Sequence, residues 1–414
     1  MPEPTVVVVG AGQAGCQTVF SLREAGFAGR VLLVGAEQHL PYQRPPLSKA
    51  HLTGSADRDT LWLRPRSWFA EHGVEVRTGT RMTALHREDR ELLLDDGEVL
   101  AYDKLVLALG ARHRELPVAG TGLDGVVRLR TLDEADDVRD RLRHARRVVV
   151  VGGGFIGMEV AATAARLGKS TTVIEVADRL MGRVLSAETA AFLLRAHRSR
   201  GVETELGTTV ATIVGTAAGT VAGVDTTDGR RIPADLVLVG VGAVPNVEPA
   251  AAAGIEVDNG IAVDESLRTS DPHVYAIGDC VSFPQVRADG RRVRLESVQN
   301  AVAQGRRVAA TLAGRPGRFD SIPWFWSDQA DLKLQIAGLT SGHHEVVVKG
   351  DRETERFSAY CFADGRLLGV ESVNRPADHM AARRLLAAPT PVTPDQVRAA
   401  DFSPKAVAAG TATG

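Results

Sequence analysis

The chain has 414 residues with a formal net charge of −2, and 44% of its residues are hydrophobic and 24% charged. This length suits two or three domains of ~100–200 residues each, and the balance of charge gives no bulk attraction to nucleic acid or to an anionic membrane. No apolar run approaches the roughly 20 residues that span a bilayer, and the N-terminus has no secretory pattern, so we expect a cytoplasmic protein that binds neither membrane nor nucleic acid.

The first predicted element is a strand over residues 5–10, which continues directly into the turn GAGQAG and a helix over 13–25. Gly10 can adopt the turn geometry that a side chain would forbid, and Gly12 leaves no Cβ where a pyrophosphate must approach. Gly15 lets the helix pack close to the strand, and the helix N-terminus offers free N–H groups to phosphates. The segment therefore predicts a dinucleotide site.

Two candidate contacts follow the next predicted strand, residues 31–34. Glu37 lies near the position where such folds bind a ribose hydroxyl, although a solvated loop glutamate is the alternative. The segment HLPYQRPPLSKAHL, residues 39–52, then combines three prolines with Arg44 and Lys49. Because adjacent prolines stiffen this loop, its cations suit contact with a phosphate or a flavin.

Short strands are predicted over residues 74–77 and 92–94, and a buried strand over 102–110. This last strand ends on small residues that include Ala108 and Gly110, so a cofactor could pass close to the backbone there.

A second glycine turn repeats the first at residues 148–157, VVVVGGGFIG. Gly152, Gly154 and Gly157 occupy the three glycine positions. Two such turns in one chain predict two dinucleotide sites.

The strand after this second turn, residues 171–174, leads to Glu175, eighteen residues beyond Gly157. A carboxylate at this spacing accepts hydrogen bonds from a ribose 2′-OH and repels a 2′-phosphate, which favours NADH over NADPH. Arg179 and Arg183 lie close by in the sequence, so use of NADPH stays open.

The remaining chain continues as strands within 202–240 and a helix over 296–312, with antiparallel strands within 332–371. Asp279 follows a glycine at the end of a strand, where α/β proteins bind ligands. The segment from residue 401 is rich in Ala, Gly, Pro and Thr and is expected to be disordered.

Several motifs in this order resemble the flavoprotein ferredoxin reductases that serve oxygenases, such as the putidaredoxin, rubredoxin and biphenyl-dioxygenase ferredoxin reductases. The motifs are VVVVGAGQAG, LPYQRPPLSK, VVVVGGGFIGMEVA, GVGAVPN, VYAIGDC and PWFWSDQ, and the likeness extends roughly from Thr5 to Pro391. LPYQRPPLSK is far more specific than either glycine turn.

The resemblance implies an α/β fold of the glutathione-reductase type, with two Rossmann-like dinucleotide-binding domains and a C-terminal α+β domain. The implied divisions are an FAD domain in two parts, 1–112 and 243–322, an NAD domain, 113–242, a C-terminal domain, 323–400, and a tail, 401–414.

The resemblance also implies the residues that hold FAD and NADH, and it implies no metal site. For FAD these are Gly10, Gly12, Ala14, Gly15, Glu37, Arg44, Lys49, Ala108, Gly110, Asp279, Val298 and Trp326, the last accompanied by Trp324. For NADH these are Gly152, Gly154, Phe155, Ile156, Gly157, Glu175 and Gly242.

Lys49 and Glu159 are the residues for which the resemblance implies a catalytic role. They would pair at the flavin, and the lysine would steady the reduced, anionic ring. The alternative for Glu159 is an ordinary glutamate in the first turn of a helix, favoured there by the helix dipole. The sequence departs from the family at Ala36, where members often carry an acid, so the adenosine contact falls to Glu37.

The implied activity is that of a ferredoxin–NAD(+) reductase. NADH would reduce FAD, and the electrons would pass singly to an iron–sulfur ferredoxin that supplies a haem monooxygenase or a ring-hydroxylating dioxygenase. Hydride transfer requires no acid or base, and a monomer or weak dimer is expected. Candidates for docking an acidic ferredoxin, by sequence position, are Arg64, Arg66, Arg306 and Arg307.

Two alternatives share this fold. A disulfide reductase or thiol-dependent NADH oxidase needs a redox cysteine beside the flavin, but the corresponding loop reads Pro-Leu-Ser-Lys, residues 46–49. Cys16, Cys280 and Cys361 form no close pair, although Cys280 could lie near FAD because it follows Asp279. A redox-sensing binding protein similar to apoptosis-inducing factor is the other alternative, and the lack of basic runs argues against its binding nucleic acid.

Overall fold

The computed structural model describes residues 3–389 and 391–410, and the chain divides into two compact units. Unit 1 joins the segment that ends at Gln43 with Arg58–Arg112 and Ala243–Ser321. Unit 2 joins Arg44–Asp57, His113–Gly242 and the residues from Ile322 onward. Each unit is therefore assembled from segments that lie far apart in the sequence, including the proline-rich loop, which groups with unit 2.

Unit 1 is built on a five-stranded parallel sheet with the first glycine turn after its middle strand. The valines of that strand are buried, as expected for a parallel sheet covered on both faces. Helices α1 (Gln13–Glu24) and α7 (Val298–Leu312) pack closely, since a Cβ on Gly305 would lie 2.8 Å from the carbonyl oxygen of Ala14. The sheet order is β19 (Val274–Ala276), β7 (Lys104–Leu107), β1 (Thr5–Val9), β2 (Arg30–Val34) and β3 (Val74–Arg77).

Smaller elements complete unit 1. They are α2 (Arg66–Glu71), α6 (Glu248–Ala252), an antiparallel sheet of β4 (Met82–His86), β5 (Glu91–Leu94) and β6 (Val99–Ala101), and a mixed sheet of β18 (Ile261–Ala262), β20 (Val281–Pro284) and β21 (Arg292–Val293). A short pair, β8 (Ala111–His113) with β17 (Ala243–Pro245), lies where the chain passes between the units.

Unit 2 repeats the arrangement with a second five-stranded parallel sheet and the second glycine turn after its middle strand. Its order is β12 (Val202–Leu206), β11 (Ser170–Glu175), β10 (Arg147–Val151), β16 (Leu236–Val239) and β9 (Val126–Val127). The unit also has helices α3 (Leu132–His144), α4 (Phe155–Arg166) and α5 (Ala187–Ser199) and an antiparallel sheet of β13 (Val210–Gly215), β14 (Val221–Thr226) and β15 (Arg231–Pro233).

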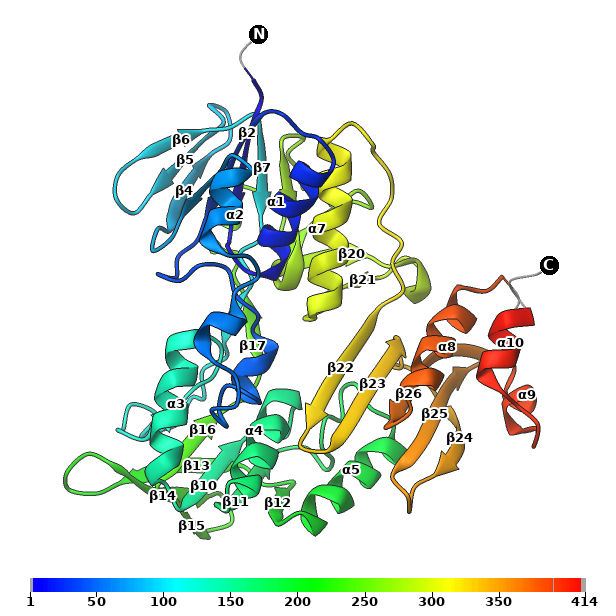
Figure 1. The fold of residues 1–414 in the computed structure, drawn as a ribbon. Coiled ribbons are helices and arrows are strands. Elements are labelled where there is room, and N and C mark those ends of the chain that lie inside the picture. Colours follow the sequence, from blue (N-terminus) through cyan, green and yellow to red (C-terminus); the bar gives the residue numbers. More distant parts are fainter. Residues whose placement is uncertain (1–2, 390, 411–414) are drawn as a thin grey trace. The chain divides into compact units, whose positions relative to one another are not determined.

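A C-terminal antiparallel sheet belongs to unit 2 and begins with the hairpin of β22 and β23 (Figure 1). Helix α8 (Pro376–Ala387) contacts β23 and β26 of this sheet. The sheet order is β22 (Trp324–Gln329), β23 (Leu332–Gly338), β26 (Arg366–Val373), β25 (Arg356–Ala363) and β24 (Glu345–Asp351), and α9 (Pro394–Arg398) follows α8. The predicted fold class, two Rossmann-like domains with a C-terminal α+β part, is confirmed.

The segment expected to be a disordered tail differs from that expectation. Helix α10 (Pro404–Gly410) forms there and contacts α8, with Ala408 buried. A Ser-Pro start explains the helix, because the Ser403 hydroxyl accepts a hydrogen bond from the Ala406 N–H and alanines follow. Residues 411–414 of that prediction lie outside the described residues.

Two searches of the described residues gave no candidates. No helix there combines the length and hydrophobicity that crossing a membrane requires. The same residues hold no cluster of three or more His, Cys, Asp or Glu side chains able to bind a metal ion.

Candidate functional site

The three glycines of the first turn meet different surroundings in the structure. Gly10 has φ +113°, and a Cβ there would lie 2.1 Å from the carbonyl oxygen of Ala108. A Cβ on Gly15 would lie 2.0 Å from the carbonyl oxygen of Gly10. Gly12 has ordinary extended backbone, and its Cβ direction meets no protein atom within 4 Å. Two of the glycines thus serve packing, whereas the third keeps a space open.

The second glycine turn reproduces this geometry. Gly152 has φ +111°, and its Cβ would lie 2.4 Å from the carbonyl oxygen of Gly240. A Cβ on Gly157 would lie 2.1 Å from the Gly152 oxygen, while the Cβ direction of Gly154 is open. Gly240 therefore corresponds to Ala108, because its carbonyl oxygen lies against the first glycine of the turn. Gly240 was not predicted as a site residue, although it lies in the glycine-containing run LVLVGVG, residues 236–242.

The helices that begin at both turns have uncapped N-termini. Gly12 and Gly154 are the N-caps of α1 and α4, and neither first turn contains an acid. Helices α3, α5 and α7 are instead capped by the hydroxyls of Thr131, Ser186 and Ser297. First-turn N–H groups and the positive dipole ends of α1 and α4 therefore remain available to an anion beside an open space. This combination fits the pyrophosphates of two dinucleotides.

An acid follows the second strand of each parallel sheet. After β11, the Glu175 carboxylate accepts hydrogen bonds from the Gly153 N–H at 2.6 Å and the Ala177 N–H at 2.8 Å, so it is fixed against the second glycine turn. After β2, Glu37 accepts a hydrogen bond from the Tyr42 hydroxyl at 2.5 Å. Each carboxylate is thus held at the end of a strand where nucleotide folds bind ribose.

Other predicted residues of unit 1 gather around the first turn. Gly278 precedes Asp279 and approaches Ala14 so closely that a Cβ on Gly278 would lie 3.1 Å from the Ala14 methyl group. The Gly278 N–H donates to Oε1 of Gln304 at 2.7 Å, and Val298 begins the same helix, α7. The strand-end segment that includes Gly110 is tied down by Asn246, whose side chain donates to the Leu109 carbonyl at 2.8 Å.

In unit 2 the proline-rich loop places a cation on a buried carboxylate. The Lys49 Nζ lies 2.6 Å from Oε2 of Glu159, and the Ser48 hydroxyl donates to the same oxygen at 2.5 Å. The side chain of Glu159 is only 3% exposed and that of Lys49 is 20% exposed. A third hydrogen bond, from Ser327 to Oε1 at 2.6 Å, completes the coordination of the carboxylate. Arg44, also predicted, donates to the Arg130 carbonyl at 2.5 Å in the same unit.

Strand β22 contacts α4 through its buried face. Phe325 of the strand packs on Phe155 of the helix, with ring centroids 4.5 Å apart. Two residues further along the strand, Ser327 bonds to Glu159, which lies one turn further along the helix. Ile156 is exposed. The rings of Trp324 and Trp326 follow one another at 6.1 Å, on alternate positions of the strand. Sequence reasoning missed Ser327, although strand alternation within PWFWSDQ places it on the face opposite to the tryptophans.

All three cysteines are free and buried. Burial raises the pKa of Cys280 to about 12 and raises those of Cys16 and Cys361 well above the usual value. Because the thiolate is the reactive form, none of the three is suited to a redox or nucleophilic role. This finding argues against the disulfide-reductase alternative.

Replacing Cys280 with serine is expected to leave NADH oxidation unchanged. Its Sγ donates to the Ile277 carbonyl at 3.3 Å, and a serine hydroxyl can make the same bond. Exchange of a buried thiol for a hydroxyl costs about 1–2 kcal/mol of unfolding free energy. Steady-state kinetics and thermal unfolding measure the two effects. Loss of turnover in protein with full FAD content would instead make Cys280 a redox residue.

The four arginines predicted for docking differ in their surroundings. Arg64, Arg66 and Arg306 are exposed, as a docking residue must be, whereas Arg307 is half-buried. Arg64 stacks its guanidinium 4.5 Å from the centroid of the Phe20 ring, and Arg307 donates to the Arg315 carbonyl. Arg306 and Arg66 therefore remain the stronger candidates.

Comparison with known proteins matches nearly the whole chain to nucleotide-dependent reductases. A family model described as pyridine nucleotide-disulphide oxidoreductase matches residues 4–305, and one described as reductase C-terminal matches 324–408. Rhodocoxin reductase of Rhodococcus erythropolis is 48% identical over 401 residues, covering 97% of this chain and 93% of the relative. These matches confirm the resemblance expected from the motifs.

Two solved structures are also similar. The ferredoxin reductase for the CYP199A2 system from Rhodopseudomonas palustris has a TM-score of 0.95 and 47% identity, covering 98% of this chain and 99% of its own. The covalent putidaredoxin reductase–putidaredoxin complex has a TM-score of 0.96 and 39% identity, with both chains fully covered.

Proposed function

Because the chain belongs to the pyridine nucleotide-disulphide oxidoreductase family and is an oxidoreductase that uses FAD and NAD(H), we propose that it passes electrons from NADH to a ferredoxin. The ferredoxin in turn supplies an oxygenase, such as a haem monooxygenase or a ring-hydroxylating dioxygenase. Relatives named as reductases of rhodocoxin and putidaredoxin support this proposal.

One observation carries the proposal, namely the Lys49–Glu159 ion pair in a loop that has no cysteine. With only buried, high-pKa thiols in the chain, electrons have no internal disulfide to reduce. Bound FAD supplies the change from two-electron to one-electron chemistry, and the electrons leave to another protein.

In this proposal, the residues of the chain bind the two nucleotides, orient them and tune the flavin. We assign the open spaces at Gly12 and Gly154 to the pyrophosphates of FAD and NADH, respectively. Glu175 binds the adenosine ribose of NADH and repels the 2′-phosphate of NADPH. Lys49, held in place by Glu159 and the stiff loop, presents positive charge to the flavin. No side chain is needed as an acid or base for hydride transfer.

The partner is an iron–sulfur ferredoxin in a transient complex. The covalent complex of putidaredoxin reductase with putidaredoxin provides the precedent in a relative that this chain covers fully. Use of NADH supports a cytoplasmic location, and the three unpaired cysteines agree with a reducing compartment. A monomer or weak dimer stays a prediction.

Steady-state NADH oxidation with a panel of ferredoxins tests the proposal. We expect at least one ferredoxin to accelerate cytochrome reduction far above the background oxidase rate, with NADH preferred over NADPH. Dye reduction serves as the control for an intact flavin enzyme. If dye is reduced but no ferredoxin of the panel is, the proposed acceptor is wrong, and a slow redox-sensing binder becomes the better reading. Preference for NADPH would instead overturn the role of Glu175.

A further inference from the structure

The hydrogen bonds around Glu159 continue into the interior of unit 2. Ser327 bonds to the Glu159 carboxylate at 2.6 Å and to Nε2 of Gln329 at 3.1 Å. Oε1 of Gln329 in turn lies 2.6 Å from Nε2 of His197, which is on α5. Ser327, Gln329 and His197 are all fully buried. An unbroken chain of hydrogen bonds therefore joins Lys49 to a histidine that no other proposed role uses.

Every donor in this chain points toward the carboxylate. Glu159 as a carboxylate only accepts, so the Ser327 hydroxyl donates to it and must accept from the amide nitrogen of Gln329. This fixes the orientation of the Gln329 amide group. Its nitrogen faces Ser327 and also approaches Sδ of Met181 at 3.6 Å, so its oxygen, Oε1, faces His197. His197 consequently donates through Nε2. Aligned hydrogen bonds strengthen one another in a low-dielectric interior, and here they all favour negative charge on Glu159.

His197 is held in one tautomer. Its Nε2 carries the proton, whereas Nδ1 is buried with no hydrogen-bond partner, which suits the unprotonated nitrogen of a neutral imidazole. Burial lowers the pKa of His197, so the ring stays neutral at physiological pH. The histidine thus ends the chain as a neutral donor and adds no charge to it.

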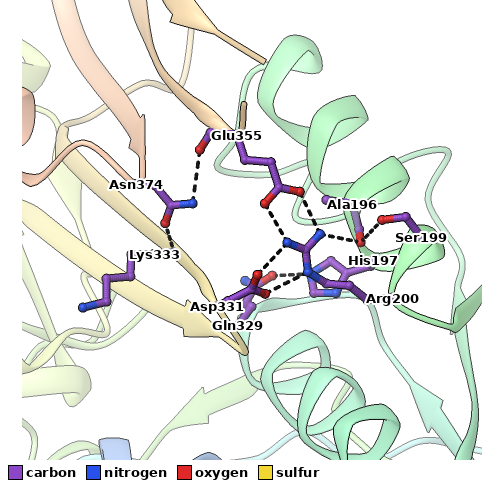
Figure 2. Close-up of polar contacts among 9 residues, drawn as sticks. All are labelled: Ala196, His197, Ser199, Arg200, Gln329, Asp331, Lys333, Glu355 and Asn374. Carbon is purple, nitrogen blue, oxygen red and sulfur yellow. Dashed lines mark hydrogen bonds and ion pairs between the residues drawn. The ribbon is translucent and has the colours of Figure 1, made fainter. Parts of the chain in front are cut away.

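The same end of α5 has a second and separate attachment to the C-terminal sheet (Figure 2). Arg200 forms ion pairs with Asp331 at 2.8 Å and Glu355 at 2.6 Å. Figure 2 shows that His197 and Arg200 both reach the β22–β23 hairpin, at Gln329 and Asp331. Only His197 continues to Glu159. Arg200 is therefore a matched control for the loss of an attachment between α5 and the hairpin.

We propose that His197 is a positioning residue for the flavin site, which acts through Gln329 and Ser327 to hold the Glu159 carboxylate, and with it the Lys49 ammonium group, in place. A carboxylate as buried as that of Glu159 is costly to ionise unless its oxygens are fully hydrogen-bonded. The hydrogen-bond chain supplies the bond on Oε1, while Ser48 and Lys49 supply those on Oε2. Without it, Oε1 of the buried carboxylate loses its donor, and Glu159 holds Lys49 less firmly in place. This inference rests on the proposed function of Lys49 as the cation that tunes FAD.

The experiment compares four single variants and one double variant of the FAD-loaded protein, and the main measurement is the midpoint potential of the bound FAD. His197→Leu removes the terminal donor, whereas His197→Gln places an amide N–H where Nε2 donates. Arg200→Leu removes the neighbouring anchor and its charge but leaves every member of the hydrogen-bond chain in place. Lys49→Met removes the cation itself and also serves as a background for His197→Leu.

We expect His197→Leu to make the potential more negative and to slow FAD reduction by NADH about 10-fold, as removal of an outer-shell partner does elsewhere. His197→Gln should restore most of the parent potential. Arg200→Leu should lower the melting temperature but keep the parent potential. In the Lys49→Met background, His197→Leu should cause no further shift.

The possible outcomes distinguish the role of His197 from the proposed role of Lys49. A parent potential in His197→Leu, beside a shifted potential in Lys49→Met, would overturn the role of His197 and leave that of Lys49 intact. An equal shift in Arg200→Leu would also overturn it, because anchoring would then explain the effect. An unshifted potential in Lys49→Met would remove both roles, while the ferredoxin assay would still decide the acceptor.

Discussion

Replacing Lys49 with methionine is expected to slow reduction of the bound FAD by NADH about 100-fold, the usual effect of losing one charge-stabilising group. Methionine keeps the apolar stem but removes the ammonium group that lies 2.6 Å from Glu159. The buried carboxylate then has no cation, so the free energy of unfolding should also fall by about 3 kcal/mol. Anaerobic stopped-flow absorbance at the flavin band measures the rate, and denaturant unfolding measures the stability.

The double variant Lys49→Met with Glu159→Gln separates these two effects. Glutamine can accept from Ser327 through its carbonyl oxygen and donate to the Ser48 hydroxyl oxygen through its amide nitrogen. No buried charge remains, so stability should return while reduction stays slow. Lys333→Met, at an exposed lysine on β23, is the control and should match the parent. Recovery of the rate in the double variant would show that Lys49 serves folding only.

The sequence was most informative where the backbone itself is constrained. Gly10 and Gly15 are required because any Cβ would collide with a carbonyl oxygen, and such collisions leave glycine in the sequence at fixed spacing. The pairing of Lys49 with Glu159 came only from the resemblance, since 110 residues separate them. Spacing along the chain carries no information about such a contact.

The rest of the Lys49 site depends on tertiary packing that a local pattern does not encode. Ser327 and Gln329 are ordinary polar residues of a strand until α4 and α5 pack beside them. His197 lies near the end of a helix that the sequence pattern did not predict, and nothing in its neighbourhood marks it as buried. The grouping of residues 44–57 with unit 2 has the same origin, because their hydrogen bonds reach Glu159 and Thr163.

Substitution of Gly12 by valine is expected to give a folded protein that has lost FAD. The backbone at Gly12 is extended, with φ −82° and ψ −168°, which valine adopts readily. Its Cβ would meet no protein atom within 4 Å, so the side chain is directed into the space that we assign to the pyrophosphate. We expect FAD affinity to fall on the order of 100-fold or more, which corresponds to about 3 kcal/mol. Circular dichroism of the apoprotein and titration with FAD measure the two properties.

The matched substitution Gly154→Val assigns the two turns to their nucleotides. Gly154 has the same extended backbone and the same open space, at the start of α4 instead of α1. If the second turn binds NADH, this variant retains FAD and its dithionite-reduced form still reduces ferredoxin, but its KM for NADH rises on the order of 100-fold. Gly10→Ala, whose Cβ would lie 2.1 Å from a backbone oxygen, should instead misfold and so mark the difference between a packing glycine and a binding glycine. Loss of FAD from Gly154→Val with normal NADH binding by Gly12→Val would reverse the assignment, and the flavin would then belong to unit 2.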